Sequence, residues 1–249
     1  MRIAVISDVH GNILALDAVL GDIAKQRADR IVDLGDRVSG PLWPKETFDR
    51  LKALGIPGVR GNHDRIVGGN PREGMGLSDA VAWDALDAAD RAELAALPFT
   101  LEFAPGLRAF HATPAHDDRY TLDDIHDGRL HRAGIGKILR RLGGFEARII
   151  MMGHSHRPDM IRLPDGRLVL NPGSVGDPGY EDITGQRHVS EAGTPHARYA
   201  LLDIADMAFP DVTFRAVPYD FERAARRAEQ NDRAEWAHAL RTGLMPRPA

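Results

Sequence analysis

The amino-acid sequence predicts an α/β protein in which β-sheets pack between helices. Three observations lead to this fold class. Short runs rich in Val and Ile recur along the chain, and segments with helical periodicity separate the first of them. The later runs follow one another in hairpin-like succession. With 249 residues, the chain is also long enough to bury a substantial core between such layers.

The first half of the chain alternates predicted strands and helices. Asn12 is suited to cap the first helix, Pro44 opens the second, and Pro98 ends the third. The predicted elements of this half are a strand at 3–6, a helix at 13–23, a strand at 31–34, a helix at 44–54 and a helix at 78–97.

The second half is richer in strands. The predicted elements are strands at 99–103 and 107–110, a helix at 135–142, and strands at 149–152, 167–170, 199–204 and 212–217. The polar, Gly-rich stretch 176–197 predicts a mobile or functional loop, and the charged tail from Phe221 predicts a surface helix with frayed final residues. We expect one domain over residues 1–249, with a motif-bearing core at about 1–205 and a C-terminal strand and helix at 206–249.

The composition excludes several classes of protein. A net charge of −4 argues against general nucleic-acid binding, which usually needs a basic excess. The absence of cysteine excludes disulfides, thiolate nucleophiles and cysteine-bound zinc, and it fits a reducing cytoplasm. The N-terminus lacks the long apolar stretch of a signal peptide, and no apolar run reaches the roughly 18 residues of a membrane helix. We therefore expect a cytoplasmic protein without a membrane partner.

Polar residues able to bind metal follow the predicted strands, each where a strand ends. Because the carboxyl ends of strands form the ligand-binding crevice of α/β sheets, we expect these side chains to converge. Their oxygen and nitrogen donors suit divalent Mn, Fe, Co, Ni or Zn. The set consists of two carboxylates, one amide and five imidazoles: Asp8, His10, Asp36, Asn62, His63, His111, His154 and His156.

The spacing of these residues favours a site for two cations. Asp8 and His10 are two residues apart, as are His154 and His156, so each pair can be directed at one point from a strand end. A carboxylate such as Asp36 can bridge two cations about 3.5–4 Å apart. Such a pair lowers the pKa of a shared water and neutralises charge that develops on a phosphoryl group.

Five short motifs, in order, resemble the sequence blocks of the calcineurin-like metallophosphoesterases. A sixth, residues 171–176 (Asn-Pro-Gly-Ser-Val-Gly), is similar to a block of the small bacterial and archaeal phosphodiesterase-like branch of that family. The resemblance covers about residues 1–205. The five motifs are Asp8-Val9-His10, Gly35-Asp36, Gly61-Asn62-His63-Asp64, His111, and Gly153-His154-Ser155-His156.

This resemblance implies a four-layer αββα sandwich, with two mixed β-sheets flanked by helices. It also implies two divalent metal ions and a non-ligand histidine, His63, that stabilises the transition state or protonates the leaving group. Asp64 would orient that histidine, although a solvated turn residue is an equal alternative. By motif position, one ion would be held by Asp8, His10, Asp36 and His156, and the other by Asp36, Asn62, His111 and His154.

The implied activity is metal-dependent hydrolysis of phosphomonoesters or phosphodiesters, with a nucleotide, another small phosphate ester or a phosphoprotein as substrate. Arg37-Val38-Ser39 stands where serine/threonine phosphoprotein phosphatases and diadenosine tetraphosphatases carry Asp-Arg-Gly, which weakens both assignments. Three more residues, Arg37, His116 and Tyr120, are candidates to face the substrate. The alternative functions are a catalytically silent scaffold, as in the retromer subunit of this family, and a metal-binding regulatory protein.

Overall fold

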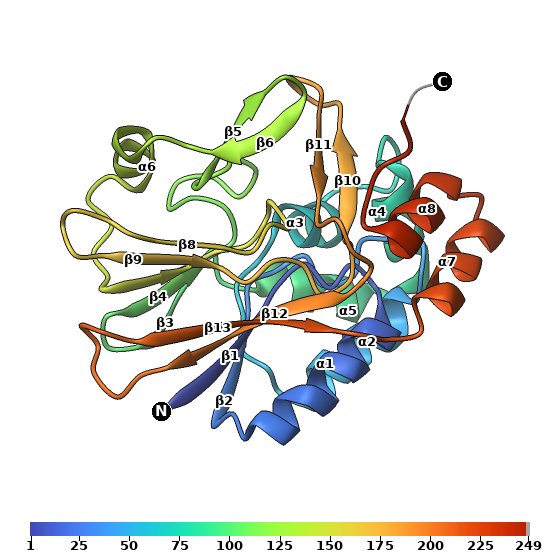
Figure 1. Ribbon diagram of the computed structural model, residues 1–249. Coiled ribbons are helices and arrows are strands. Elements are labelled where there is room, and N and C mark those ends of the chain that lie inside the picture. Colours follow the sequence, from blue (N-terminus) through green and yellow to red (C-terminus); the bar gives the residue numbers. More distant parts are fainter. Residues whose placement is uncertain (248–249) are drawn as a thin grey trace.

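Two β-sheets face each other at the centre of the computed structural model, which describes residues 1–247 (Figure 1). The first sheet is mixed: β1 is parallel to β2 and antiparallel to β12. Its strands, in spatial order, are β13 (Asp211–Val217), β12 (Ala197–Asp203), β1 (Arg2–Ile6) and β2 (Arg30–Asp33).

The second sheet is also mixed. Its three central strands are parallel, and both of its edge strands run antiparallel to their neighbours. In spatial order the strands are β3 (Thr100–Ala104), β4 (Leu107–Phe110), β7 (Ile149–Met151), β9 (Leu168–Asn171) and β8 (Asp159–Arg162).

Alternate residues of β1 belong to different layers of the core. Ile3 and Val5 pack between the two sheets, whereas Ala4 and Ile6 pack under helix α1 (Ile13–Gln26). Because both faces of β1 are covered, the strand is a continuous apolar run. The same arrangement explains why the Val- and Ile-rich runs were the clearest strand signals in the sequence.

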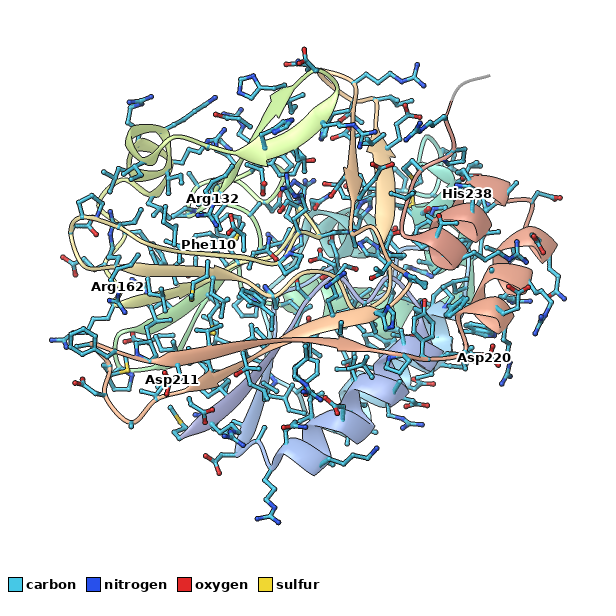
Figure 2. All side chains as sticks on the ribbon, viewed as in Figure 1. Phe110, Arg132, Arg162, Asp211, Asp220 and His238 are labelled. Carbon is cyan, nitrogen blue, oxygen red and sulfur yellow. The ribbon has the colours of Figure 1, made fainter. Side chains whose placement is uncertain are left out.

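Helices cover the outer faces of both sheets. Helices α1 and α2 (Pro44–Ala53) cover the first sheet, and α6 (Ile135–Leu142) covers the second, where Ile138 packs with the fully buried Phe110 (Figure 2). The predicted class, two mixed sheets flanked by helices, is therefore confirmed.

A third sheet lies above the ends of the other two and was not predicted (Figure 1). Two of its strands fall within residues 176–197, so the prediction of a loop there is wrong in part. Each strand has four residues, and only Leu130 of β6 belongs to the buried apolar residues, which explains the weak sequence signal. The order is β10 (Gly179–Asp182), β11 (His188–Glu191), β6 (Arg129–Arg132) and β5 (Asp123–His126).

The remaining helices correct two further predictions. The helix expected at 78–97 is two helices, α4 (Leu77–Ala85) and α5 (Ala88–Ala96), because the Asp87 carboxylate accepts from Asp90 N (2.9 Å) and starts a new helix. A short helix that was not predicted, α3 (Asn62–Gly69), begins within the four-residue motif Gly61-Asn62-His63-Asp64.

The C-terminal tail forms two helices rather than one. Helices α7 (Phe221–Gln230) and α8 (Ala234–Thr242) pack on each other and bury alanine faces with Leu42 and Leu240, so they are not simply a solvated surface. The predicted fraying of the last residues falls partly at 248–249, outside the described residues. Among residues 1–247, no helix is long and apolar enough to cross a membrane.

Candidate metal centre

The loops that follow β1, β2, β4 and β7 meet at one end of the two sheets. Backbone hydrogen bonds join neighbouring loops: Asp8 N donates to Gly35 O (3.0 Å), and Gly153 N donates to His111 O (2.8 Å). A link between the sheets comes from His154 N, which donates to Asp8 Oδ2 (3.2 Å). The structure thus brings together residues that lie almost 150 positions apart in the sequence, as the strand-end argument predicted.

Most of the predicted metal-binding residues have a left-handed backbone. This conformation costs an L-residue about 1–2 kcal/mol. Such strain persists where the surrounding structure holds the backbone in place, and it is concentrated at functional sites. The five residues and their φ angles are Asp8 (54°), His10 (49°), Asp36 (57°), His154 (67°) and His156 (57°).

The first cluster contains Asp8, His10 and His156, whose ligand atoms lie within 4.8 Å of one another. His10 Nδ1 donates to Ser39 O (2.7 Å), and His156 Nδ1 donates to Asp177 O (2.9 Å). With these protons on Nδ1, two Nε2 lone pairs face each other at 3.1 Å. Asp8 Oδ1 is buried and has no hydrogen-bond partner among the described residues. A cation satisfies three such acceptors.

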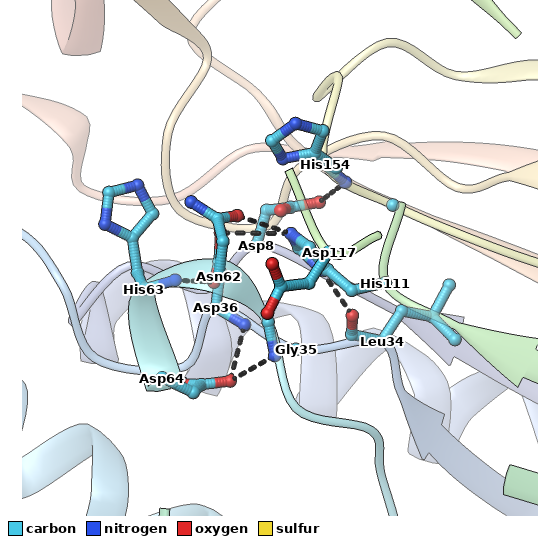
Figure 3. Close-up of polar contacts among 12 residues, drawn as sticks. Asp8, Leu34, Gly35, Asp36, Asn62, His63, Asp64, His111, Asp117 and His154 are labelled. Atoms are coloured by element: carbon cyan, nitrogen blue, oxygen red, sulfur yellow. Dashed lines mark hydrogen bonds and ion pairs between the residues drawn. The ribbon is translucent and has the colours of Figure 1, made fainter. Parts of the chain in front are cut away.

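The second cluster contains Asp36, His111 and His154, again within 4.8 Å (Figure 3). His111 Nδ1 donates to Leu34 O (2.7 Å), which directs Nε2 into the cluster. Asn62 Oδ1 lies 3.1 Å from His111 Nε2, and the same atom position is 3.2 Å from His154 Nδ1 and from Asp36 Oδ2. The side chain of Asn62 therefore reaches into this cluster, where its amide oxygen could ligate a cation; without one, turning the amide lets its NH2 group donate to Asp36 Oδ2 and His154 Nδ1 instead.

The electrostatics of the buried site favour positive charge. Burial opposes protonation of His111, but the carboxylates of Asp36 and Asp8 outweigh it and raise the pKa of His111 to about 10. Burial, the largest cause, lowers the pKa of His10 to about 4. The site therefore holds a proton on one imidazole and an unprotonated nitrogen on another. A divalent cation that displaces the proton fits this donor set.

Each cluster contains residues predicted to hold one of the two ions, and the difference concerns Asp36, which was predicted to belong to both sets. Asn62 lies with the second cluster, as expected. Asp36 groups with His111 and His154. Its role as a bridge to the first cluster stays a prediction.

His63 lies beside the clusters and is held by a residue that the sequence did not indicate. Its Nδ1 lies 2.7 Å from Asp79 Oδ1, on α4, and 3.3 Å from Ser39 Oγ. Its ring centroid is 5.6 Å from that of His10, and a third of its side chain is exposed (33%). Burial lowers the pKa of His63, but the charges of Asp36 and Asp79 raise it to about 9.

Asp64 has a different role from the predicted one. Its carboxylate accepts from Asp36 N (2.8 Å), Arg37 N (3.0 Å) and Gly61 N (3.0 Å). Figure 3 shows it directed at the backbone of Asp36 and away from the His63 ring. Asp64 therefore fixes the loop that carries Asp36, and the orienting contact to His63 comes from Asp79 instead.

The segment 171–176 supports the metal-binding loops. Asn171 Nδ2 donates to Gly153 O (2.8 Å), and Ser174 Oγ donates to Asp8 O (2.7 Å). Through these contacts the segment supports the metal-binding loops and is more than a simple turn.

The three other substrate-facing candidates differ in their positions. Arg37 is buried in an ion pair with Asp33 (Nε to Oδ2, 2.6 Å), so it does not face a substrate. His116 is exposed and lines a cavity in the third sheet. Tyr120 lines the same cavity and stacks on His154, with ring centroids 5.0 Å apart.

Sequence reasoning missed the residues that orient the imidazoles. Ser39 and Asp177 orient His10 and His156 through their backbone carbonyls, and a backbone contact leaves no signal in the sequence. Asp79 is one of several acidic residues in an Ala-rich helical stretch. Its only distinguishing feature is the three-dimensional contact with His63.

The arrangement of fold and site is that of a known superfamily. Residues 1–206 match the family described as the calcineurin-like phosphoesterase superfamily domain. The chain belongs to this superfamily, and the resemblance seen in the sequence motifs is confirmed. Its members are phosphoesterases that generally bind divalent metals, so the two His/Asp clusters are candidate metal-binding groups.

Three relatives are similar over nearly the whole chain. An uncharacterized protein of Methanocaldococcus jannaschii is 28% identical over 258 residues, which cover 94% of each chain. The crystal structure of a metallophosphoesterase from Sphaerobacter thermophilus has a TM-score of 0.76 and 24% identity, covering 98% of this chain and 100% of that one. A hypothetical protein from Pyrococcus horikoshii has a TM-score of 0.73 and 18% identity, covering 98% and 99%. Both structures support the fold.

Proposed function

We propose that this protein hydrolyses phosphomonoesters or phosphodiesters with two divalent metal ions, and that His63 assists the departure of the leaving group. One observation carries the proposal: two clusters of facing nitrogen and oxygen acceptors lie beside an imidazole held by a carboxylate. Asp8, His10 and His156 would hold one ion, and Asp36, Asn62, His111 and His154 the other. Manganese, iron, nickel, cobalt and zinc all suit these donors.

Bound cations would supply an acidified water and neutralise negative charge on the phosphoryl oxygens. The contribution of the protein's own side chains follows from their contacts. Asp79 accepts a hydrogen bond from Nδ1–H of His63, so the proton on Nε2 is the one available for transfer. In the protein without metal, and despite burial, the charges of Asp36 and Asp79 raise the pKa of His63 to about 9, and the contact with Asp79 favours the protonated ring that would donate to the leaving oxygen.

The proposed substrate is a small phosphate ester or nucleotide, with a phosphoprotein as the second candidate. The proposed location is the cytoplasm, on the basis of the cysteine-free sequence.

The test is hydrolysis of p-nitrophenyl phosphate and bis-p-nitrophenyl phosphate after loading with Mn²⁺, for the natural protein and a His63→Ala variant. We expect turnover that needs metal and that falls by about 10²–10⁴ in the variant. The control is His238→Ala, since His238 is exposed on α8 and outside the site (Figure 2). Two bound metals without turnover of either ester would contradict the proposal and favour a silent scaffold or a regulatory protein.

A further inference from the structure

A cavity of about 580 Å³ lies beside the second metal cluster, between the third sheet, α6 and the loop that follows His111. Its volume is within the range of sites that bind small molecules, about 300–1,000 Å³. Thr113 and Tyr120 contribute from the loop, and His188 contributes from β11. None of the predicted metal ligands lines it. The cavity is therefore an adjoining compartment of the candidate site.

Tyr120 forms the wall shared by the cavity and the metal cluster. One face of its ring stacks on His154, at 5.0 Å and an interplanar angle of 29°. Its hydroxyl lies 2.6 Å from His188 Nε2 and 2.8 Å from Tyr180 Oη. Because His188 Nδ1 donates to Gln186 O (2.7 Å), Nε2 is the acceptor and the Tyr120 hydroxyl donates to it. These contacts fix the wall from two sides.

Two arginines on the cavity are free to bind an anion. Arg119 and Arg140 are exposed, and within residues 1–247 neither makes a side-chain ion pair. The adjacent Arg141 is different: its guanidinium donates to Thr121 O (3.0 Å) and to Asp124 Oδ1 (2.7 Å). Arg141 supports the fold, and its two neighbours in the cavity are left with unused donors.

Two carboxylates also line the cavity, and they leave the arginines available. Asp182 Oδ1 accepts from both the backbone N and the Oγ1 of Thr184 (2.7 Å each). Asp118 is exposed and makes no ion pair with Arg119 or Arg140 in the described part of the chain.

We propose that this cavity binds the non-reacting part of the substrate, and that Arg119 and Arg140 recognise a second phosphate on it. The planar guanidinium fork matches phosphate oxygens in a bidentate manner. The cavity, which Tyr120 and both arginines line, has a volume of about 580 Å³, enough for a group the size of a nucleoside. This inference rests on the proposed phosphoesterase function, because the reacting phosphate would lie at the metal clusters.

The experiment compares the binding of adenosine 5′-monophosphate and adenosine 3′,5′-bisphosphate to the Mn²⁺-loaded full chain by titration calorimetry. A His63→Ala background keeps the ligands from being consumed. We expect the bisphosphate to bind roughly tenfold more tightly, the scale of one charge-assisted contact. In Arg140→Gln and Arg119→Gln this preference should fall below about threefold, with the monophosphate affinity unchanged.

Arg148→Gln is the matched control. Arg148 is also exposed and without an ion pair among the described residues, but it precedes β7 at the opposite end of that strand from His154. It should keep the full preference. The proposal would be overturned if both nucleotides bound with equal affinity while Arg119 and Arg140 are intact. It would also be overturned if Arg140→Gln weakened the binding of both nucleotides equally.

Turnover is measured separately, with p-nitrophenyl phosphate and the natural His63. A bisphosphate preference without turnover would mean that the proposed hydrolysis fails while the binding cavity stands. Turnover without a preference for the bisphosphate would mean that the proposed hydrolysis stands while the proposed role of the cavity fails.

Discussion

At the scale of single residues, the site depends on side chains that hold other side chains. The imidazoles of His10, His111 and His156 each donate Nδ1–H to a backbone carbonyl, which directs Nε2 inward. His63 is held by a carboxylate instead, which also stabilises its charged form. That difference separates residues suited to bind a cation from one suited to transfer a proton.

Asp79→Asn tests this distinction. Because Asp79 contributes to the raised pKa of His63 of about 9, its removal should lower that pKa. If protonated His63 is the acid, activity is lost as pH rises through its pKa, so the loss should begin at lower pH in the variant. We expect kcat to fall about tenfold or more. The measurement is the pH profile of kcat with p-nitrophenyl phosphate.

Asp84→Asn is the control, since Asp84 lies on the same helix and pairs with Arg72 at the surface. An alkaline limit that does not move in Asp79→Asn would count against His63 as the acid.

Gly61→Ala tests the packing around Asp36. A methyl group at Gly61 would overlap the Asp36 carboxylate and approach Asp36 N. We expect the second cluster to lose its metal, so that metal analysis finds about one ion fewer per chain. The control is Gly69→Ala at the end of the same helix, where a methyl group meets nothing within 4 Å. Full metal content in Gly61→Ala would show that the loop can shift without cost to the site.

At the scale of secondary-structure elements, the C-terminal helices reach back to the metal centre. This hairpin lies beyond residue 206, where the family match ends. Asn231 Nδ2 donates to Pro41 O (2.5 Å), and Arg227 Nε donates to Leu42 O (3.2 Å). The Trp236 ring centroid is 6.1 Å from that of His10. The helices thus support the loop whose Ser39 carbonyl orients His10.

Trp236→Ala should therefore weaken the first cluster in particular. We expect its metal affinity to drop by about 10–100-fold, the usual scale for groups that orient a ligand. The measurement is a metal titration that resolves two binding steps. His238→Ala, an exposed change on the same helix, is the control. An equal effect on both steps would point to general destabilisation and not to the position of His10.

The elements also show which parts of the structure can be predicted from sequence. Strands such as β1 and β7 are buried on both faces, so their apolar runs identify them. The strands of the third sheet are short and mostly polar, and their pairing (for example Val189 with Arg129) joins distant segments. Likewise, the metal-binding residues follow strand ends, but Asp79 meets His63 only because α3 and α4 pack together. Local sequence patterns predict the buried strands and the metal-binding residues at their ends. The third sheet and the contact between Asp79 and His63 are seen only in the folded chain.

At the scale of the whole molecule, the concentration of buried negative charge links pH, metal binding and stability. Without a cation, His111 has a pKa of about 10, well above its ordinary value near 6.5. Protonated His111 therefore stabilises the metal-free fold fully below about pH 6.5, and this contribution is lost as pH rises through about 10. A cation competes for the same nitrogen, so its binding has the opposite pH dependence.

The stabilisation by Mn²⁺ should consequently grow with pH. Ligand at 100 times its dissociation constant stabilises a fold by about 2.7 kcal/mol for each site, and this increment shrinks as protons compete at lower pH. We expect the increase in Tm on adding Mn²⁺ to be larger at pH 8.5 than at pH 5.5, and the metal retained after dialysis to be lower at pH 5.5 than at pH 7.5. The control is the protein freed of metal by a chelator. Its Tm should not rise between pH 6.5 and 8.5, because the stabilisation by protonated His111 only decreases as pH rises. Equal metal content at both dialysis pH values would contradict a site in which the cation replaces a proton on a buried imidazole.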